Sequence, residues 1–349
     1  MTQKILIINT GSTSVKFDLF VDNESRAAHT VTFSDTDRQA LESTLAARVS
    51  DFLKANNTQL SDLSAIAARG GLLKPLEAGT YLITEEMVAD LSEARYGRHP
   101  SNYAAPLAVR LARQAGIPAY TVNPVTVDEM DEIAHMTGIL GIRRRSIFHV
   151  LSHKACARRA ADELGKPYEK CNFIIVHMGG GISIGAHCNG RVVDVNNALD
   201  GDGPIAPERA GSIPAGQLAS LCFSGAVSRE DMAKILTGYG GVFALLGTRN
   251  MQTVEEMIRN GDTKALRAVE AMAYSICKEI GAMAAVLNGK VDAVVLTGGL
   301  ASWQRLVDLI RERIQFIGPI LVYTENMEMQ ELAQSVLNVL DGVEQCKAY

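Results

Sequence analysis

KILIINTGSTSVKFDLF, residues 4–20, is the stretch of sequence that decides the fold. An apolar run, Ile5–Ile8, predicts a buried strand, and a second run, Val15–Val21, predicts another. The turn between them, residues 9–14, has no apolar bulk and offers backbone N–H groups and hydroxyls that can hold an anion such as phosphate. A plain hairpin with a polar tip fits the same letters, because short Gly/Ser motifs are weak signals.

Two later stretches repeat the pattern of an apolar strand that runs into a glycine turn. Residues 173–193 read FIIVHMGGGISIGAHCNGRVV, and Asn189-Gly190 predicts a tight hairpin turn within them. Three consecutive glycines allow another group to approach the backbone closely. A third strand, 291–296, ends at Thr297-Gly298-Gly299. The repetition predicts two related halves that bind one nucleotide.

Length and charge narrow the class of protein. A chain of 349 residues exceeds the ~250–300 at which one core usually divides, so we expect two domains. The net charge of −5, without a long basic run, argues against a nucleic-acid partner. The six cysteines form no CxxC pair, no signal peptide is expected, and no apolar run reaches the ~18 residues of a membrane span. We therefore expect a cytoplasmic protein that does not bind membranes.

Several polar residues follow predicted strands. Arg69 lies between a short strand and two glycines, where it is either an anion ligand or a surface arginine before a turn. Asn123-Pro124 ends the predicted strand 119–122, at a place where α/β sheets often bind ligands.

Two further candidates lie outside the strands. His149 precedes a helix that we expect Ser152 to cap, and helix N-termini bind anions. Arg209 lies in residues 200–214, a long loop of mixed apolar and charged residues, and such loops tend to be functional.

Taken together, these motifs resemble the acetate kinase family and, within it, the butyrate kinases. The resemblance runs nearly end to end, and its longest stretches are ARGGLLKP (68–75), RHPSN (98–102), SIFHVL (146–151), VHMGGGISIGAH (176–187), VNNALDGDGPIAPERAGSIP (195–214) and VDAVVLTGGLA (291–301). It implies an α/β fold of two ribonuclease-H-like domains, as in actin-like ATPases, with a nucleotide cleft between them. The expected domains are residues 1–170 and 171–349, and a C-terminal helix at 327–341 is expected to pack back on the first.

The resemblance also implies an activity, which is reversible, direct in-line transfer of a phosphoryl group from ATP, with Mg²⁺, to a short-chain fatty acid, butyrate above all. A homodimer or higher homo-oligomer is expected. The implied ATP-binding residues are Asn9, Gly11, Ser12, Ser14, Lys16, His177, Gly179, Gly180, Gly181, Gly298 and Gly299. The implied catalytic residues are Arg209, His149 and Asn123, the substrate residues Arg69 and Asn102, and the metal ligands Asn9 and Glu328.

Two positions depart from the family pattern. The substrate arginine of acetate kinases has no counterpart at its aligned place, and Arg69, a few residues on, is expected to substitute. Asn123 stands where the family has an aspartate, so a role that needs that carboxylate is open. The alternatives are a kinase for isobutyrate, other branched-chain acids, propionate or acetate, and a non-catalytic ATP-binding module of the same fold.

Overall fold

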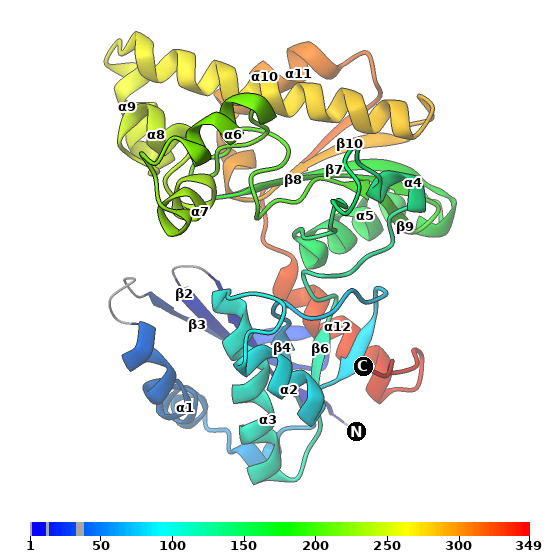
Figure 1. Cartoon of the computed structure of the whole chain (residues 1–349). Coiled ribbons are helices and arrows are strands. Elements are labelled where there is room, and N and C mark those ends of the chain that lie inside the picture. The colour runs from blue at the N-terminus through cyan, green and yellow to red at the C-terminus, as the bar shows by residue number, and fades with distance from the viewer. Residues whose placement is uncertain (1, 12–13, 33–37) are drawn as a thin grey trace. The chain divides into compact units, whose positions relative to one another are not determined.

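The computed structural model describes residues 2–11, 14–32 and 38–349, with only the backbone for 38–43. The chain forms two compact units (Figure 1). Unit 1 comprises the residues up to Asp128 together with Met327–Tyr349, and unit 2 is Glu129–Asn326. The division thus lies before residue 129 and not at the expected residue 170. Residues 129–170 belong to unit 2 because its helix α5 (Val150–Glu163) packs against strands of that unit.

Unit 1 is built on a mixed sheet with the strand order β3-β2-β1-β4-β6-β5. The first three strands form an antiparallel meander, β1 pairs in parallel with β4, and β4 pairs in parallel with β6. The bounds are β1 (Lys4–Thr10), β2 (Ser14–Val21), β3 (Glu24–Thr32), β4 (Ala65–Arg69), β5 (Thr80–Leu82) and β6 (Ala119–Val122). The predicted first hairpin is confirmed, with Asn9 opposite Lys16.

Helices cover this sheet. They are α1 (Arg38–Ala55), α2 (Glu85–Ser92), α3 (Ala104–Ala115) and α12 (Glu328–Leu340), with short 3₁₀ turns η2 (Leu60–Asp62) and η3 (Pro100–Tyr103). Leu6 and Ile8 of β1 join the apolar cluster of α1 and α3. The alternate residues of β1 point to the other face. Helix α12 contacts β1, β4 and β6, so the C-terminal helix is part of unit 1.

Unit 2 has the strand order β9-β8-β7-β10-β11, which corresponds strand for strand to β3-β2-β1-β4-β6 of unit 1. Its strands are β7 (Asn172–Met178), β8 (Ile182–Cys188), β9 (Arg191–Val195), β10 (Ala293–Thr297) and β11 (Ile320–Tyr323). The β8–β9 turn has positive φ angles at Asn189 and Gly190, as the predicted tight hairpin requires. Both units therefore have a three-stranded meander extended by parallel strands, which confirms the predicted ribonuclease-H-like fold.

One face of this second sheet packs on the long helix α10 (Thr263–Val286), whose Ile276 and Ile280 are fully buried. Helix α5 packs against β7 and β10. The other elements of unit 2 are α4 (Glu132–His135), α6 (Ala215–Phe223), α7 (Arg229–Thr237), α8 (Gly241–Leu246), α9 (Met251–Arg259), α11 (Gln304–Ile314), η4 (Tyr168–Lys170) and η5 (Gly299–Ser302). Within the described residues, no helix is long and apolar enough to cross a membrane.

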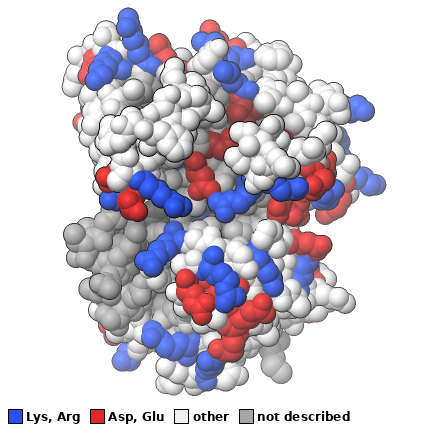
Figure 2. Space-filling view, in the orientation of Figure 1, with Lys and Arg blue, Asp and Glu red and all other residues white. Residues whose placement is uncertain are grey.

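Charged side chains of both signs are interspersed on the face that Figure 2 draws. Unit 1 contains several ion pairs, among them Arg95 with the buried Asp90 at 2.6 Å and Lys74 with Glu86 at 3.5 Å. The described part of this face therefore offers an anionic ligand particular side chains and not a broad basic surface.

Candidate active site

The strand period places Asn9 and Arg69 on one face of the sheet of unit 1. Asn9 follows Ile5 and Ile7 in alternate positions of β1, and Arg69 holds the corresponding place at the end of β4, which runs parallel to β1. Helix α12 contacts these strands and brings Glu328, its first residue, to the same strand ends. Three polar side chains from distant parts of the sequence therefore meet at the carboxyl ends of two neighbouring strands, where open α/β sheets bind ligands.

These three side chains form a buried cluster. Asn9 Nδ2 donates to Glu328 Oε2 at 3.0 Å, and Arg69 Nη1 donates to Asn9 Oδ1 at 3.4 Å. Arg69 Nη1 lies 3.7 Å from Glu328 Oε2. The Nε atom of Arg69 is buried without a hydrogen-bond partner in the described part of the chain. An unpaired buried donor is costly, and an anionic ligand would remove that cost.

The predicted phosphate turn begins directly beyond Asn9. Gly11 N donates to Ser14 O at 2.8 Å. Lys16 faces Asn9 across the β1–β2 ladder, and residues directly opposite each other lie on the same face. The structure thus brings Asn9, Gly11, Ser14 and Lys16 to one end of the hairpin, while Ser12 lies outside the described residues.

Asn123 makes one contact that an aspartate carboxylate could not make, a donated hydrogen bond. Its φ of 44° is left-handed, a conformation that asparagine tolerates well. Its Oδ1 accepts from Gly79 N at 2.8 Å, and its Nδ2 donates to Glu331 Oε1 at 3.4 Å. An aspartate carboxylate here would face the buried carboxylate of Glu331. The amide therefore replaces a repulsive contact by a hydrogen bond.

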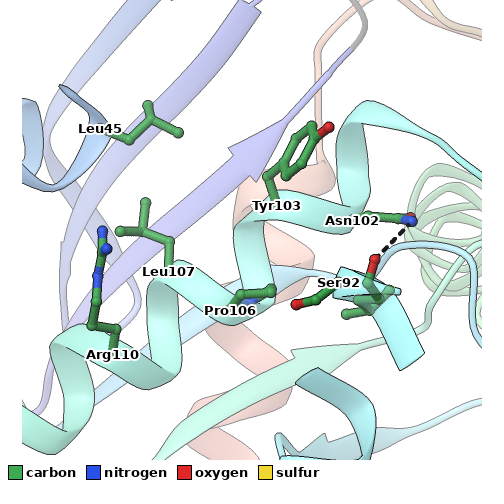
Figure 3. A pocket seen from close by; sticks show the side chains of 8 residues that line it. Leu45, Ser92, Asn102, Tyr103, Pro106, Leu107 and Arg110 are labelled. Carbon is green, nitrogen blue, oxygen red and sulfur yellow. Dashed lines mark hydrogen bonds between the residues drawn. The ribbon is translucent and has the colours of Figure 1, made fainter. Parts of the chain in front are cut away.

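Asn102 holds the backbone around the Arg69-Gly70-Gly71 turn. Its Oδ1 accepts from Leu72 N at 2.9 Å, and its Nδ2 donates to Gly97 O at 3.0 Å and to Leu91 O at 3.4 Å. Asn102 also borders a pocket of about 360 Å³, but Figure 3 shows its amide turned away from Leu45, Leu107 and Arg110, which line the other end. A Cβ at Gly71 would overlap Asn102 Oδ1, so the two residues fix this turn together.

A second polar cluster lies in unit 2. His177 of β7 pairs with Ser183 of β8 in register, and His187 follows Ser183 at alternate strand positions, so all three side chains point to one face. Helix α5 packs against β7. It begins at Val150, with His149 at its N-cap position, so the expected cap by Ser152 is wrong. Ser152 lies inside the helix, and its Oγ is 2.8 Å from His177 Nδ1.

The imidazole rings of His149 and His177 are stacked, with centroids 4.0 Å apart and planes 16° from parallel. His149 Nδ1 lies 2.8 Å from Ser183 Oγ, which is also 2.9 Å from His153 Nε2. The structure thus brings the two predicted histidines together. Sequence reasoning does not single out His153 and His187 as members of this cluster, although the alternation of Ser183 and His187 along β8 is a signal that could have pointed to the second.

The buried histidines make the stability of unit 2 depend on pH. Burial, followed by the charge of His177, lowers the pKa of His153 well below its ordinary value, and burial followed by His153 does the same for His187. As the pH falls, His153 and His187 therefore become protonated in the unfolded chain before they do in the folded one. Their neutral burial costs no stability above the ordinary histidine pKa of ~6.5, and the free energy of unfolding decreases as the pH falls below that value.

We expect the free energy of unfolding of unit 2 to fall by up to ~2.7 kcal/mol per pH unit below pH ~6.5, since two protons are linked to unfolding. Urea titrations at several pH values, followed by fluorescence, measure this slope. The single tryptophan, Trp303, is buried in unit 2 and reports on it. His187→Met should halve the slope, and an unchanged slope in that variant would contradict the assignment.

Arg209 lies against the glycine turn of unit 2. The loop that carries it is anchored to this turn, where Glu208 N donates to Gly180 O at 3.3 Å. A Cβ at Gly181 would overlap the Arg209 guanidinium, and a Cβ at Gly180 would lie 2.5 Å from Glu208 Oε1. The Nε atom of Arg209 is buried without a hydrogen-bond partner among the described residues. Burial lowers the pKa of Arg209, whereas the negative charges of Glu208 and Asp200 raise it. The guanidinium remains charged.

Gly298 and Gly299 follow β10, beside the turn that follows β7. Gly298 has a φ of 87°, and a Cβ there would press on the backbone of Met178. Gly299 has open space around it. The structure therefore brings the predicted residues of unit 2 to one end of its sheet, namely His149, His177, the 179–181 turn, Arg209, Gly298 and Gly299. The other predicted residues that the structure describes belong to unit 1.

The sequence model of the acetokinase family matches residues 133–340, more than half of the chain. The chain belongs to the acetokinase family. Membership makes it an ATP-dependent kinase of short-chain carboxylates, and the acid that it prefers is a separate question.

Solved structures of acetokinases share the fold of this family member. Acetate kinase of Porphyromonas gingivalis superposes with a TM-score of 0.79 at 22% identity, covering 97% of this chain and 100% of that one. Propionate kinase of Francisella tularensis gives 0.78 at 22% identity, with coverages of 95% and 98%. Acetate kinase of Entamoeba histolytica gives 0.76 at 16% identity, with coverages of 95% and 98%. At these identities the comparisons show the fold alone.

Proposed function

We propose that this acetokinase transfers the γ-phosphoryl group of ATP directly to butyrate, giving butyryl phosphate and ADP in a reversible reaction. The observation that carries the proposal is the pair of buried arginine Nε atoms, in Arg69 and Arg209, that have no hydrogen-bond partner among the described residues. Each is a positively charged group with an unused donor, and each borders a turn of small residues. Two anions, a carboxylate and a phosphoryl group, are the ligands that such donors bind best.

The chemistry needs charge stabilisation and not a base. A carboxylic acid with a pKa near ~4 is ionised at pH 7. A carboxylate oxygen attacks the γ-phosphorus, the bond from that phosphorus to the β–γ bridging oxygen breaks, and ADP leaves with the electron pair. Charge spreads over the equatorial phosphoryl oxygens, so positioning and cationic donors supply most of the catalysis.

The proposed roles follow the two clusters. Arg209, His149 and Asn123 act on the transferring phosphoryl group, and Arg69 binds the carboxylate, with Asn102 holding the turn beside it. ATP is bound through Asn9, Gly11, Ser12, Ser14, Lys16, His177, Gly179, Gly180, Gly181, Gly298 and Gly299. The homodimer and the cytoplasmic location stay predictions.

The residues around Glu328 fit Mg²⁺ bound together with a nucleotide. Magnesium usually takes one or two carboxylates and completes its octahedron with phosphate oxygens and water. Glu328 supplies a buried carboxylate and Asn9 an amide oxygen. The described residues contain no cluster of three or more His, Cys, Asp or Glu side chains that would form an all-protein cage. When bound, the ion would neutralise phosphate charge.

Glu328→Gln is expected to raise the Mg²⁺ concentration for half-maximal rate about 10-fold, because it removes the negative ligand and keeps the side-chain shape. Initial rates measured over a Mg²⁺ series at saturating ATP test this. Glu344→Gln, an exposed position in the same unit, is the matched control. Identical Mg²⁺ curves for both variants would contradict a metal role for Glu328.

The preferred acid is tested with a panel of two- to five-carbon acids, straight and branched. Each methylene in a fitted pocket is worth ~1–3 kcal/mol, or roughly 10–200-fold in kcat/KM. The proposal expects the highest kcat/KM for butyrate. A maximum at acetate or propionate, or at isobutyrate or a five-carbon branched acid, would keep the carboxylate kinase and reassign its substrate.

A further inference from the structure

A hydrogen-bonded chain of side chains runs from His149 into the interior of unit 2. His149 Nδ1 lies 2.8 Å from Ser183 Oγ, and Ser183 Oγ lies 2.9 Å from His153 Nε2. His153 Nδ1 lies 3.2 Å from His187 Nε2, and His187 Nδ1 lies 2.7 Å from the hydroxyl of Tyr168. Phosphoryl transfer as proposed uses only the first member, so the other four need an explanation.

The inner members have no contact with water that could supply alternative partners. Ser183, His153 and His187 are fully buried. Burial lowers the pKa of both inner histidines well below the ordinary value, so each ring is neutral and carries one proton. A neutral imidazole donates from one nitrogen and accepts at the other. The chain can therefore be ordered in only two directions, either toward His149 or away from it.

Both ends of the chain select the same direction. At the inner end, a phenol O–H is a stronger donor than an imidazole N–H, and an imidazole nitrogen is a stronger acceptor than a phenol oxygen, so Tyr168 donates to His187 Nδ1. At the outer end, a phosphoryl oxygen only accepts, so His149 needs a proton on Nε2. In a neutral ring, its Nδ1 must then accept from Ser183. Every hydrogen bond between these ends follows in the same sense.

We propose that Tyr168, His187, His153 and Ser183 are positioning residues that hold His149 as a neutral imidazole with its proton on Nε2. His149 then donates to the phosphoryl oxygens without having to be protonated to imidazolium. The inference rests on the proposed role of His149 in phosphoryl transfer. It adds the property that this role is independent of pH through the range in which a histidine ordinarily titrates.

The charged groups around the chain are paired. On α5, Lys154 Nζ lies 2.7 Å from Glu129 Oε2 and 5.5 Å from the centre of the Tyr168 ring. From β7, His177 stacks on His149, and its Nδ1 contacts Ser152 Oγ at 2.8 Å. The edge of Phe148 covers His153, with ring centroids 5.0 Å apart. His177→Asn in the same background removes the imidazole that stacks on His149 and separates its effect from that of the chain.

The test compares kcat against pH, from 6.5 to 8.5, for wild type, His187→Met and His187→Gln at saturating MgATP and butyrate. Wild type is expected to change less than about 2-fold. His187→Met removes the donor to His153, so the proton on Nε2 of His149 is no longer fixed and His149 must be protonated to imidazolium in order to donate. In this variant kcat should fall up to about 10-fold per pH unit above the pKa of His149. Glutamine keeps an N–H donor toward His153 and should restore the flat profile. A loss that is uniform with pH in His187→Met, as a structural defect gives, would overturn the proposal.

A second measurement does not depend on activity. Two-bond ¹H–¹⁵N spectra of the full chain with ¹⁵N-labelled histidine, at pH 8, report the tautomer of each ring. The proposal expects the Nε2–H form for His149, His153 and His187, and Tyr168→Phe should loosen this preference at His187. An Nδ1–H form of His149 in wild type would overturn it. If no acid is phosphorylated, the proposed function fails, but these spectra still decide the direction of the chain.

Discussion

Arg209→Ala is expected to lower kcat by ~10³–10⁵-fold while the KM for ATP changes little. The guanidinium is partly buried against the glycine turn, with an Nε atom that no described residue satisfies. Negative charge spreads over the equatorial phosphoryl oxygens only in the transition state. The Arg209 guanidinium therefore stabilises the transition state more than it stabilises the bound ATP. Steady-state kinetics with saturating acid separates the two parameters.

Two further variants make the Arg209 result specific. Arg209→Lys keeps the charge but loses the planar, bidentate donor, so we expect an intermediate kcat. Arg259→Ala removes a side chain on α9 that is 71% exposed, and its kcat should equal wild type. A near-wild-type kcat for Arg209→Ala, or an effect on the KM for ATP alone, would contradict a role in the transition state.

Gly181→Ala is expected to lower kcat by about 10²-fold, because a new Cβ at this position overlaps the Arg209 guanidinium and must displace it. A shift of about 1 Å in a catalytic group can cost 10²-fold in rate. The change adds only one methyl group at a turn, so a thermal melt of the variant should stay close to that of wild type.

The control for this substitution is Gly216→Ala in α6, where a Cβ meets nothing within 4 Å. It should leave kcat unchanged. The double variant Gly181→Ala/Arg209→Ala is the sharper comparison, since the glycine acts through the arginine and the two losses should not add. Additive losses would show that Gly181 acts by another route, such as the binding of ATP.

The repeated strand–turn–strand pattern was enough to predict two related halves, because the buried strands have simple apolar patterns, while the ribonuclease-H-like fold was predicted from the resemblance to the acetate kinase family. Ile5–Ile8 and Phe173–Val176 lie in the central strands of their sheets. The domain boundary could not be read in the same way. Helix α5 lies before residue 170 in sequence but packs on β7, a strand that follows it, and a linear pattern does not show this long-range contact.

The site was predictable where a residue follows a strand and unpredictable where a distant helix completes it. Asn9 and Arg69 end parallel strands, so their meeting follows from the strand period. The contact of Asn123 with Glu331 depends on how α12 docks, and it explains why an amide stands where an aspartate was expected. The register of β8 places His187 on the same face as Ser183, but the place of His153 depends on how α5 packs against the sheet, which the sequence pattern does not show.

A non-catalytic ATP-binding module of the same fold is the main rival, and Asn123 is the residue that favours it. The two accounts differ in whether phosphoryl transfer occurs at all. The most direct measurement is the ratio of trapped acyl hydroxamate to ADP in reactions that contain ATP, Mg²⁺, hydroxylamine and butyrate. The carboxylate kinase predicts one hydroxamate for each ADP and neither product when the acid is omitted. ATP binding with no hydroxamate from butyrate, or from any other two- to five-carbon acid, would contradict it.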